Sequence, residues 1–283
     1  MTISPSPLVT VYVATRNRVA LLARALASIE GQRRDDIEII VVDDASDDDT
    51  PLLLAEWAAQ GRLRWFRNDR SRGACASRNH ALREARGRYM AGLDDDDEML
   101  PGRITTLLEA LRPEDAFVCG SDWIVATGRR PRLRIVPSRI DRAAILSRNV
   151  VGNQVLAERS KLLACGGFDE TLPAAQDYDL WIRMILAHGP ARGVRRPLQR
   201  IHVHAGATRI SSSPSRRRGY WTVYRKHRAQ MDDASRRAHL YNLRRANGHA
   251  TRLPRDARFL VPRNRIRLLW HVVLDSHGRR TPR

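Results

Sequence analysis

Residues 37–50 read IEIIVVDDASDDDT and residues 88–101 read RYMAGLDDDDEMLP, and these two stretches decide the fold. Each is a mostly apolar run of strand length that ends abruptly in aspartates. Strands that are apolar along most of their length are typical of a parallel sheet covered on both faces. In open parallel sheets ligands bind at the carboxyl ends of the strands. We therefore expect both acidic clusters to line a ligand site.

The segments around these two stretches alternate between strand and helix patterns. Strand-like runs occupy residues 8–14, 37–42, 63–67 and 88–93. Helical patterns occupy residues 19–29, 50–59 and 73–86, and we assign Thr50 as the N-cap of the second helix with Pro51 as its first residue. The alternation predicts an α/β fold with a mainly parallel central sheet and flanking helices. Further on we expect helices at 101–111, 159–164 and 176–187 and a strand at 116–125.

The composition is that of a globular protein. The chain has 283 residues, and its hydrophobic fraction of 42% is too high for a disordered chain. Cys75, Cys119 and Cys165 are widely spaced, which indicates reduced thiols and neither a zinc site nor a disulfide framework. No leader is visible, and no run approaches the roughly 20 apolar residues of a membrane span. We expect a cytoplasmic protein, with peripheral association at the inner face of the cytoplasmic membrane.

Positive charge is concentrated at the end of the chain. Residues 211–283 hold 19 Arg and Lys against 4 Asp, a net charge of +15 out of +19 for the whole chain. We therefore divide the chain into a domain at 1–210 and a basic, mostly helical extension at 211–283. Helices are expected at 219–241 and 263–275. Such a field attracts polyanions, either an anionic membrane surface or nucleic acid.

The run of four aspartates at 94–97 suggests a metal site. Adjacent carboxylates repel one another unless solvent or a divalent cation neutralises them, and a solvated acidic loop explains the run alone equally well. Mg²⁺ and Mn²⁺ prefer oxygen ligands, and Mg²⁺ is often held by one or two carboxylates together with substrate phosphates. The apolar strand before the run and Pro101 after it favour a site for Mn²⁺ or Mg²⁺.

The chain resembles the family 2 glycosyltransferases of GT-A fold over residues 8–205. The resemblance rests on the order of several short motifs, of which each alone is weak. They are VTVYVATRNR at 9–18, VVDDASDDDT at 41–50, RGACASRNHAL at 72–82, RYMAGLDDDDEMLP at 88–101, and GGFDE at 166–170 followed by QDYDLWIR at 176–183. The resemblance implies an inverting enzyme that transfers a sugar from a nucleotide diphosphate, with a UDP-sugar expected, to an acceptor hydroxyl.

The resemblance also implies roles for individual residues. Asp44 would contact the base or ribose, Arg78 the base or diphosphate, and Asp94 the donor sugar or ribose. Asp96 would bind the metal most directly. The nucleotide-binding residues would be Thr15, Arg16, Asn17, Asp43, Asp44, Arg78, Asp94 and Asp95.

Residues toward the end of the match are implied on the metal and acceptor sides. His204, on the same strand face as His202, would approach the metal, with Arg209 near the diphosphate; a structural or surface role for the two histidines stays open. Asp177 would be the general base that takes the acceptor proton, with Asp179 as the alternative. The acceptor side would be formed by Gly167, Phe168, Gln176 and Trp181, although Trp181 also fits a core position.

Two residues depart from the family pattern. Ala45 stands where glycine is usual, so a positive φ there would cost on the order of 1 kcal/mol. Gln176 replaces the glutamate before Asp177, and the missing negative charge would leave the pKa of Asp177 lower than otherwise.

The expected partners are a nucleotide-diphospho-sugar donor and a glycan or lipid-linked glycan acceptor of the cell envelope, such as a lipopolysaccharide. For the basic extension we favour docking on an anionic membrane surface, or on a phosphorylated lipid-linked glycan, over nucleic acid, because no nucleic-acid-binding motif accompanies it. A basic, solvated pair of helices that packs beside the enzyme domain is a third alternative. A sugar-phosphate nucleotidyltransferase and a non-catalytic polyanion-binding protein remain alternatives. The first normally carries a glycine-rich loop after the first strand, where this chain reads ATRNRVALLARA.

Overall fold

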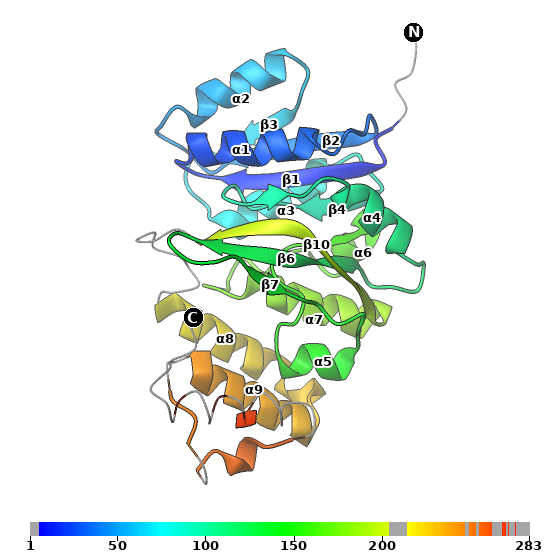
Figure 1. Ribbon diagram of the computed structural model, residues 1–283. Coiled ribbons are helices and arrows are strands. Elements are labelled where there is room, and N and C mark those ends of the chain that lie inside the picture. The colour runs from blue at the N-terminus through cyan, green and yellow to red at the C-terminus, as the bar shows by residue number, and fades with distance from the viewer. Residues whose placement is uncertain are drawn as a thin grey trace.

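One mixed sheet forms the centre of the computed structural model (Figure 1). The structure describes residues 6–203, 214–246, 249–252, 255–261, 268, 269, 271 and 275. The described strands form a ten-stranded sheet in the order β3-β2-β1-β4-β9-β6-β10-β5, with β7 beside β6 and β8 beside β10. The strands are β1 (Val9–Thr15), β2 (Ile37–Asp43), β3 (Arg64–Arg67), β4 (Tyr89–Gly92), β5 (Glu98–Met99), β6 (Val118–Ala126), β7 (Arg132–Arg134), β8 (Arg139–Ile140), β9 (Leu156–Glu158) and β10 (Ala191–Val203).

The first half of the sheet is parallel, as its apolar strands predict. β1 pairs in parallel with β2 and β4, and β2 pairs in parallel with β3. The second half differs: β9 runs antiparallel to β4 and β6, whereas β6 and β10 are parallel. Two antiparallel steps through β9 restore the original direction, so β1, β2, β4, β6 and β10 all end at one edge, at the left in Figure 1.

Helices cover both faces of the sheet, and the last two helices pack on one side of this core (Figure 1). They are α1 (Val19–Glu30), α2 (Thr50–Ala59), α3 (Ala74–Glu84), α4 (Arg103–Ala110), α5 (Arg142–Ser147), α6 (Arg159–Ala164), α7 (Gln176–His188), α8 (Pro214–His227) and α9 (Asp233–Ala246). Alternate residues of β1 point to opposite faces of the sheet. Val11 and Val13 pack with α1 on one face, and Tyr12 packs with α3 and α7 on the other.

The basic extension joins the core of the second layer. Val223 of α8 and Leu243 of α9 belong to the same hydrophobic cluster as α5 and α7; in Figure 1, α8 lies to the left of these two helices and α9 lies below α8. A single helix at 219–241 was expected. The chain instead breaks at Met231, and Asp232 accepts a 2.6 Å hydrogen bond from the backbone N–H of Ser235, which caps α9.

Other expectations are corrected in detail or lie outside the described residues. Asp49, not Thr50, occupies the N-cap position of α2, so Pro51 is its second residue. The boundary at residues 210 and 211 and most of the helix expected at 263–275 are not among the described residues. All three cysteines are free thiols, as expected. Within the described residues, every helix falls short of the length and apolarity that a membrane crossing needs.

Candidate active site

The two acidic turns meet at the carboxyl edge of the parallel strands. β1 lies between β2 and β4, and its register pairs Thr15 with Asp43 on one side and Tyr12 with Gly92 on the other. The aspartates at 43–44 and at 94–97 therefore emerge on either side of the end of β1. This is the edge at which open α/β sheets bind ligands.

Asp94 is held by three side-chain hydrogen bonds at the acidic turn. It accepts hydrogen bonds from Arg78 Nη2 at 3.0 Å, Asn153 Nδ2 at 2.7 Å and Gln154 Nε2 at 2.7 Å, and its side chain is 26% exposed. Burial alone would lower the pKa of Arg78, but the neighbouring Asp94 holds that pKa above its ordinary value. Arg78 and Asp94 therefore form a persistent ion pair that remains partly open to solvent.

Asp95 points into the protein and anchors the turn to β1. It accepts bonds from Thr15 Oγ1 at 2.8 Å and Arg18 Nη1 at 2.9 Å, and it is 6% exposed. Burial raises the pKa of Asp95 to about 6, although Arg18 and Thr15 both favour the ionised form.

Asp97 also points inward and anchors the turn to β10. Its carboxylate accepts bonds from Gln199 Nε2 at 3.0 Å and from the backbone N–H of His202 at 3.0 Å. Burial raises the pKa of Asp97 well above its ordinary value. Because Asp95 and Asp97 are buried, Asp94 and Asp96 are the two members of the run that face outward.

Asp96 is the carboxylate best placed to meet a cation. Its side chain is 17% exposed, and one oxygen accepts a 3.3 Å bond from Arg18 Nη1. Within the described residues no three His, Cys, Asp or Glu side chains form a group that could hold a metal ion. A single carboxylate fits Mg²⁺ or Mn²⁺ only if substrate phosphates and water complete its shell.

The histidines expected near the metal are described only in part. His204 and Arg209 lie outside the described residues. His202 is in contact with Glu98, its Nε2 lying 2.6 Å from the Glu98 carboxylate.

Asp44 shapes the loop before α3. Its carboxylate accepts four hydrogen bonds, and it is 5% exposed. The donors are Asn68 Nδ2, Ser71 Oγ and the backbone N–H groups of Arg72 and Gly73, at 2.7–2.9 Å. Burial would raise the pKa of Asp44, but these bonds bring it below its ordinary value. The resemblance implies a nucleotide contact for Asp44, which stays a prediction; in the structure its oxygens hold the loop beside the site.

The turn between β2 and α2 is held by Asp43 and by contacts with Asn17. Asp43 is fully buried; one oxygen accepts a 3.0 Å bond from the Ser46 backbone N–H, and the other lies 3.5 Å from Arg67 Nε. Asn17 Oδ1 accepts a bond from the backbone N–H of Asp47 at 2.9 Å. Ala45 has φ +59°, so the left-handed conformation that its glycine-bearing relatives suggest is present here. Arg16 and Asn17 are exposed at this edge.

Asp177, the expected base, lies at the start of α7 in the same electrostatic environment as Asp94. Its carboxylate accepts a 3.3 Å bond from Asn149 Nδ2. Burial raises the pKa of Asp177, while the charge of Arg78 lowers it and that of Asp94 raises it. Desolvation therefore places the pKa of Asp177 above its ordinary value, and the effect of having Gln176 in place of a glutamate stays a prediction.

Asp179 faces away from Asp177 and holds α8. Two positions along a helix turn a side chain by about 200°. Asp179 is fully buried, with Arg183 Nε at 2.8 Å, Lys226 Nζ at 3.0 Å and His227 Nε2 at 2.8 Å. A carboxylate enclosed by three cationic or proton-donating groups has no route to an acceptor hydroxyl, so Asp177 remains the candidate base.

The aromatic residues expected on the acceptor side are buried. Trp181 is 0% exposed, and its Nε1 donates to the carbonyl of Gly152 at 3.1 Å. Phe168 is 5% exposed and lies edge-on to Trp181. Trp181 therefore occupies the core position that the sequence also allowed, and its indole N–H holds the backbone of Gly152 in place. Gly167 is buried with φ +68°, whereas Gln176 is partly exposed, so of these four residues Gln176 alone reaches the surface.

Residues 149–154 connect the two groups of carboxylates and were not expected in the site. Asn149 contacts Asp177, whereas Asn153 and Gln154 contact Asp94. The only signal in the sequence is three amide side chains just before an apolar run. An irregular segment of this kind has no periodic pattern, so its position depends on the tertiary fold.

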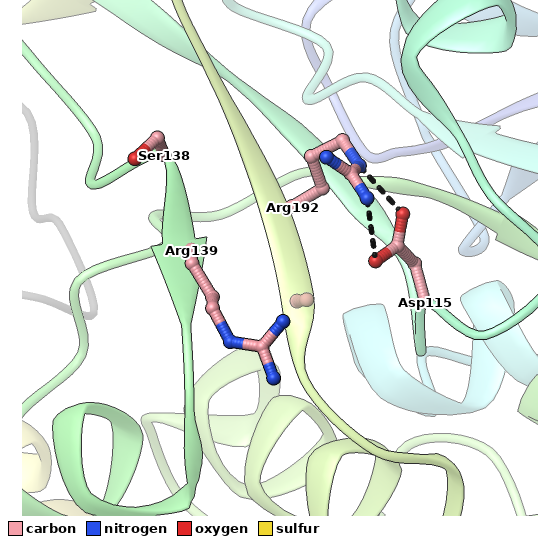
Figure 2. Close-up of a pocket in the computed structure, with 5 residues that line it drawn as sticks. Asp115, Ser138, Arg139 and Arg192 are labelled. Atoms are coloured by element: carbon pink, nitrogen blue, oxygen red, sulfur yellow. Dashed lines mark hydrogen bonds and ion pairs between the residues drawn. The ribbon is translucent and has the colours of Figure 1, made fainter.

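Two hollows are found outside this cluster. One, of about 180 Å³, is lined by Asp115, Ser138, Arg139, Ala191 and Arg192 at the starts of β8 and β10, where Asp115 and Arg192 are paired (Figure 2). It lies at the opposite edge of the sheet from Asp94. The other, of about 790 Å³, includes Arg67 and Arg72 beside the loop that Asp44 holds. Only the second adjoins the carboxyl edge.

Comparison with known proteins identifies the family. Residues 10–151 match the family described as Glycosyl transferase family 2. The Escherichia coli K12 protein WcaA, named as a glycosyl transferase of colanic acid biosynthesis, is 35% identical over 245 residues, covering 84% of this chain and 88% of that protein. WfaP of Escherichia coli, named as a UDP-Glc:alpha-D-GlcNAc-diphosphoundecaprenol beta-1,3-glucosyltransferase, is 28% identical over 208 residues, covering 71% of this chain and 79% of that protein.

A solved structure confirms the fold. S. aureus TarS 1–349 in complex with UDP-GlcNAc superimposes with a TM-score of 0.70 at 16% identity, covering 96% of this chain and 89% of that one. The α/β architecture predicted from the sequence is thus the GT-A fold. Neither the nucleotidyltransferase nor the non-catalytic alternative is supported, and the chain belongs to glycosyl transferase family 2 and is a glycosyltransferase.

Proposed function

We propose that the enzyme transfers a sugar from a UDP-sugar to a hydroxyl of a lipid-linked glycan, with inversion, during synthesis of a cell-envelope polysaccharide. The names of WcaA and WfaP support the class of product, and that of WfaP supports the donor and the diphosphate-linked lipid acceptor. The observation that carries the proposal is the arrangement at the carboxyl edge. There the Arg78–Asp94 ion pair, the outward Asp96 and the partly buried Asp177 come together.

We propose that Asp96 holds a divalent cation, Mn²⁺ or Mg²⁺, together with the donor diphosphate. When bound, the cation would neutralise charge on the departing nucleoside diphosphate. Arg78 supplies a second positive charge beside Asp94. His204 remains a proposed ligand, since its position is not described. Thr15, Arg16, Asn17 and Asp43 would contact the nucleotide at the end of β1, while Asp44 orders the adjacent loop.

Asp177 would act as the general base. Its raised pKa suits proton uptake, because a more basic carboxylate accepts a proton more readily. The acceptor oxygen forms a bond to the anomeric carbon as its proton passes to Asp177. The bond from the anomeric carbon to the phosphate oxygen breaks on the opposite face, and its electron pair leaves with the nucleoside diphosphate.

The decisive experiment compares three carboxylate variants. Asp96→Ala should abolish transfer and weaken the Mn²⁺-dependent thermal shift caused by UDP, whereas Asp177→Asn should keep that shift and lose transfer. Asp49→Ala is the matched control, because Asp49 is exposed and makes no side-chain capping bond. Normal transfer by the Asp96 variant would contradict the metal assignment, and normal transfer by the Asp177 variant would contradict the base.

We also propose that residues 1–210 form the catalytic domain and that residues 211–283 associate with the inner face of the cytoplasmic membrane. A lipid-linked acceptor is confined to a bilayer, so an enzyme that uses it gains from being held there. The excess of positive charge after residue 211 supports this arrangement.

A further inference from the structure

Helix α8 exposes a large aromatic ring at the surface. Trp221 is 46% exposed, and its ring stacks on that of Tyr224 with centroids 5.3 Å apart. The opposite side of the helix is packed, since Val223 is 0% and His227 is 4% exposed. One exposed apolar residue needs no explanation by itself. The residues around Trp221 make this one informative.

Three arginines surround the exposed ring. Arg217 and Arg225 lie four residues before and after Trp221, and Arg218 lies three before it, so all three are its neighbours on the helix surface. All three are exposed, and within the part of the chain that the structure describes no acidic partner is recorded for them. The inward-facing Lys226, by contrast, is paired with two aspartates. We call Arg217, Arg218, Trp221 and Arg225 the α8 face.

The α8 face lies on the same side of the molecule as the candidate active site. α8 begins at the left in Figure 1, at the edge where β1, β6 and β10 end. Neither of the two hollows described above is lined by residues of α8.

We propose that the α8 face docks on the surface of an anionic lipid bilayer. An indole ring prefers the boundary between headgroups and acyl chains, and guanidinium groups pair with anionic headgroups while their stems cover apolar surface. The ring of Trp221 fits the boundary between headgroups and acyl chains, and the three exposed arginines fit the anionic headgroups. The inference rests on the proposed function only in supplying a reason for membrane docking, namely a lipid-linked acceptor.

Nucleic acid is the competing class of partner, and the shape of the surface disfavours it. Binding of single strands uses a basic groove with several stacking platforms. The α8 face offers one ring on a helix that lines neither hollow. Each arginine near an anionic bilayer contributes roughly fivefold to the binding constant, and this contribution falls with salt.

The test is co-sedimentation of the full chain with vesicles. We expect binding to vesicles of phosphatidylglycerol and phosphatidylcholine, little binding to phosphatidylcholine alone, and release by added salt. The double variant Arg217→Glu with Arg225→Glu should bind at least about 25-fold more weakly. Trp221→Ala should bind several-fold more weakly, and Trp221→Tyr should restore most of the loss.

The matched control reverses the same amount of charge at the opposite edge. Arg33→Glu with Arg112→Glu changes two exposed arginines that follow α1 and α4, and it should bind vesicles much as the wild type does. Equal binding by both double variants would mean that net charge alone acts, which overturns the proposal. So would a wild type that ignores anionic vesicles, or an α8 face variant that loses oligonucleotide binding and keeps vesicle binding.

Vesicle binding can fail while the proposed sugar transfer holds, and the two outcomes are separable. All the changed side chains are exposed, so we expect unaltered melting temperatures and unaltered thermal shifts with UDP and Mn²⁺. Transfer to a detergent-solubilised acceptor should also be unchanged in the α8 face variants. If an α8 face variant lost transfer to the solubilised acceptor but kept vesicle binding, this would count against placing the active site at the carboxyl edge of the sheet.

Discussion

Replacing Asp179 by alanine should destabilise the protein strongly without touching the chemistry. Asp179 is fully buried and faces Arg183, Lys226 and His227 within 3.0 Å. Breaking a buried ion pair typically costs about 3–5 kcal/mol; we expect the lower end, because Lys226 keeps Asp169 as a partner and the side chains of Arg183 and Lys226 are 21% and 34% exposed. For a domain of this size each 1 kcal/mol lowers the melting temperature by roughly 2–4 °C. We therefore expect a fall on the order of 10 °C.

The effect should depend on pH in a defined direction. Burial raises the pKa of Asp179, but the hydrogen bond to His227 and the charges of Arg183 and Lys226 outweigh it and bring the pKa to about 2. A carboxylate with a depressed pKa stabilises the fold fully above its ordinary value of 3.8, and that contribution is lost as the pH falls toward about 2. This contribution of Asp179 to the free energy of unfolding is on the order of 2 kcal/mol. The difference in melting temperature between the wild type and Asp179→Ala should become smaller below about pH 4.

Differential scanning fluorimetry at neutral and acidic pH measures both effects. Asp177→Asn is the control on the same helix, and it should melt close to the wild type. Asp179→Ala should keep measurable transfer at a temperature where it is folded. If the variant melted within about 2 °C of the wild type at neutral pH, the reasoning about a buried network joining α7 to α8 would be refuted.

Three further changes probe the site and its turns. Gly92→Ala would place a Cβ on the side-chain oxygen Oε1 of Gln154, whose Nε2 donates to Asp94. Displacing that amide group from Asp94 should lower kcat in a transfer assay, and Gln154→Leu should do so without the steric clash. Ala45→Gly should raise the melting temperature by roughly 2–4 °C, because it relieves a φ of +59° that costs about 1 kcal/mol. The raised pKa of Asp95, about 6, means that the folded state binds its proton more tightly than the unfolded state does. Stability should therefore fall as the pH rises from about 4 to 6, and urea titrations should show this slope absent in Asp95→Asn.

The first half of the fold could be predicted because each element carries its own signal. β1, β2 and β4 are apolar runs, and α1 has apolar residues at helical spacing, so local pattern and tertiary role agree. β10 could not be bounded in the same way. It contains several arginines and Pro197, with register shifts on either side of that proline. A strand whose pairing is irregular lacks the period of two that would reveal it.

The candidate site was predicted by residue identity better than by residue role. The motifs locate Asp44, Asp94 and Asp177 at one edge, and the topology brings them there. The motifs do not say which way a side chain turns. The four donors around Asp44 belong to residues 68–73, a loop without periodicity, and the partners of Asp94 come from residues 153 and 154, far along the chain. Such partners are fixed by packing and not by local sequence.

The alternation along the acidic turn has a consequence for how the site tolerates change. The inward pair, Asp95 and Asp97, fastens the turn to two separate strands, and the outward pair, Asp94 and Asp96, is thereby presented to solvent. Deleting a single residue within the run would leave three aspartates and shift the later members by one place. Inward and outward members would then exchange positions, although the remaining letters would look almost the same. The turn must therefore keep its length as well as its carboxylates.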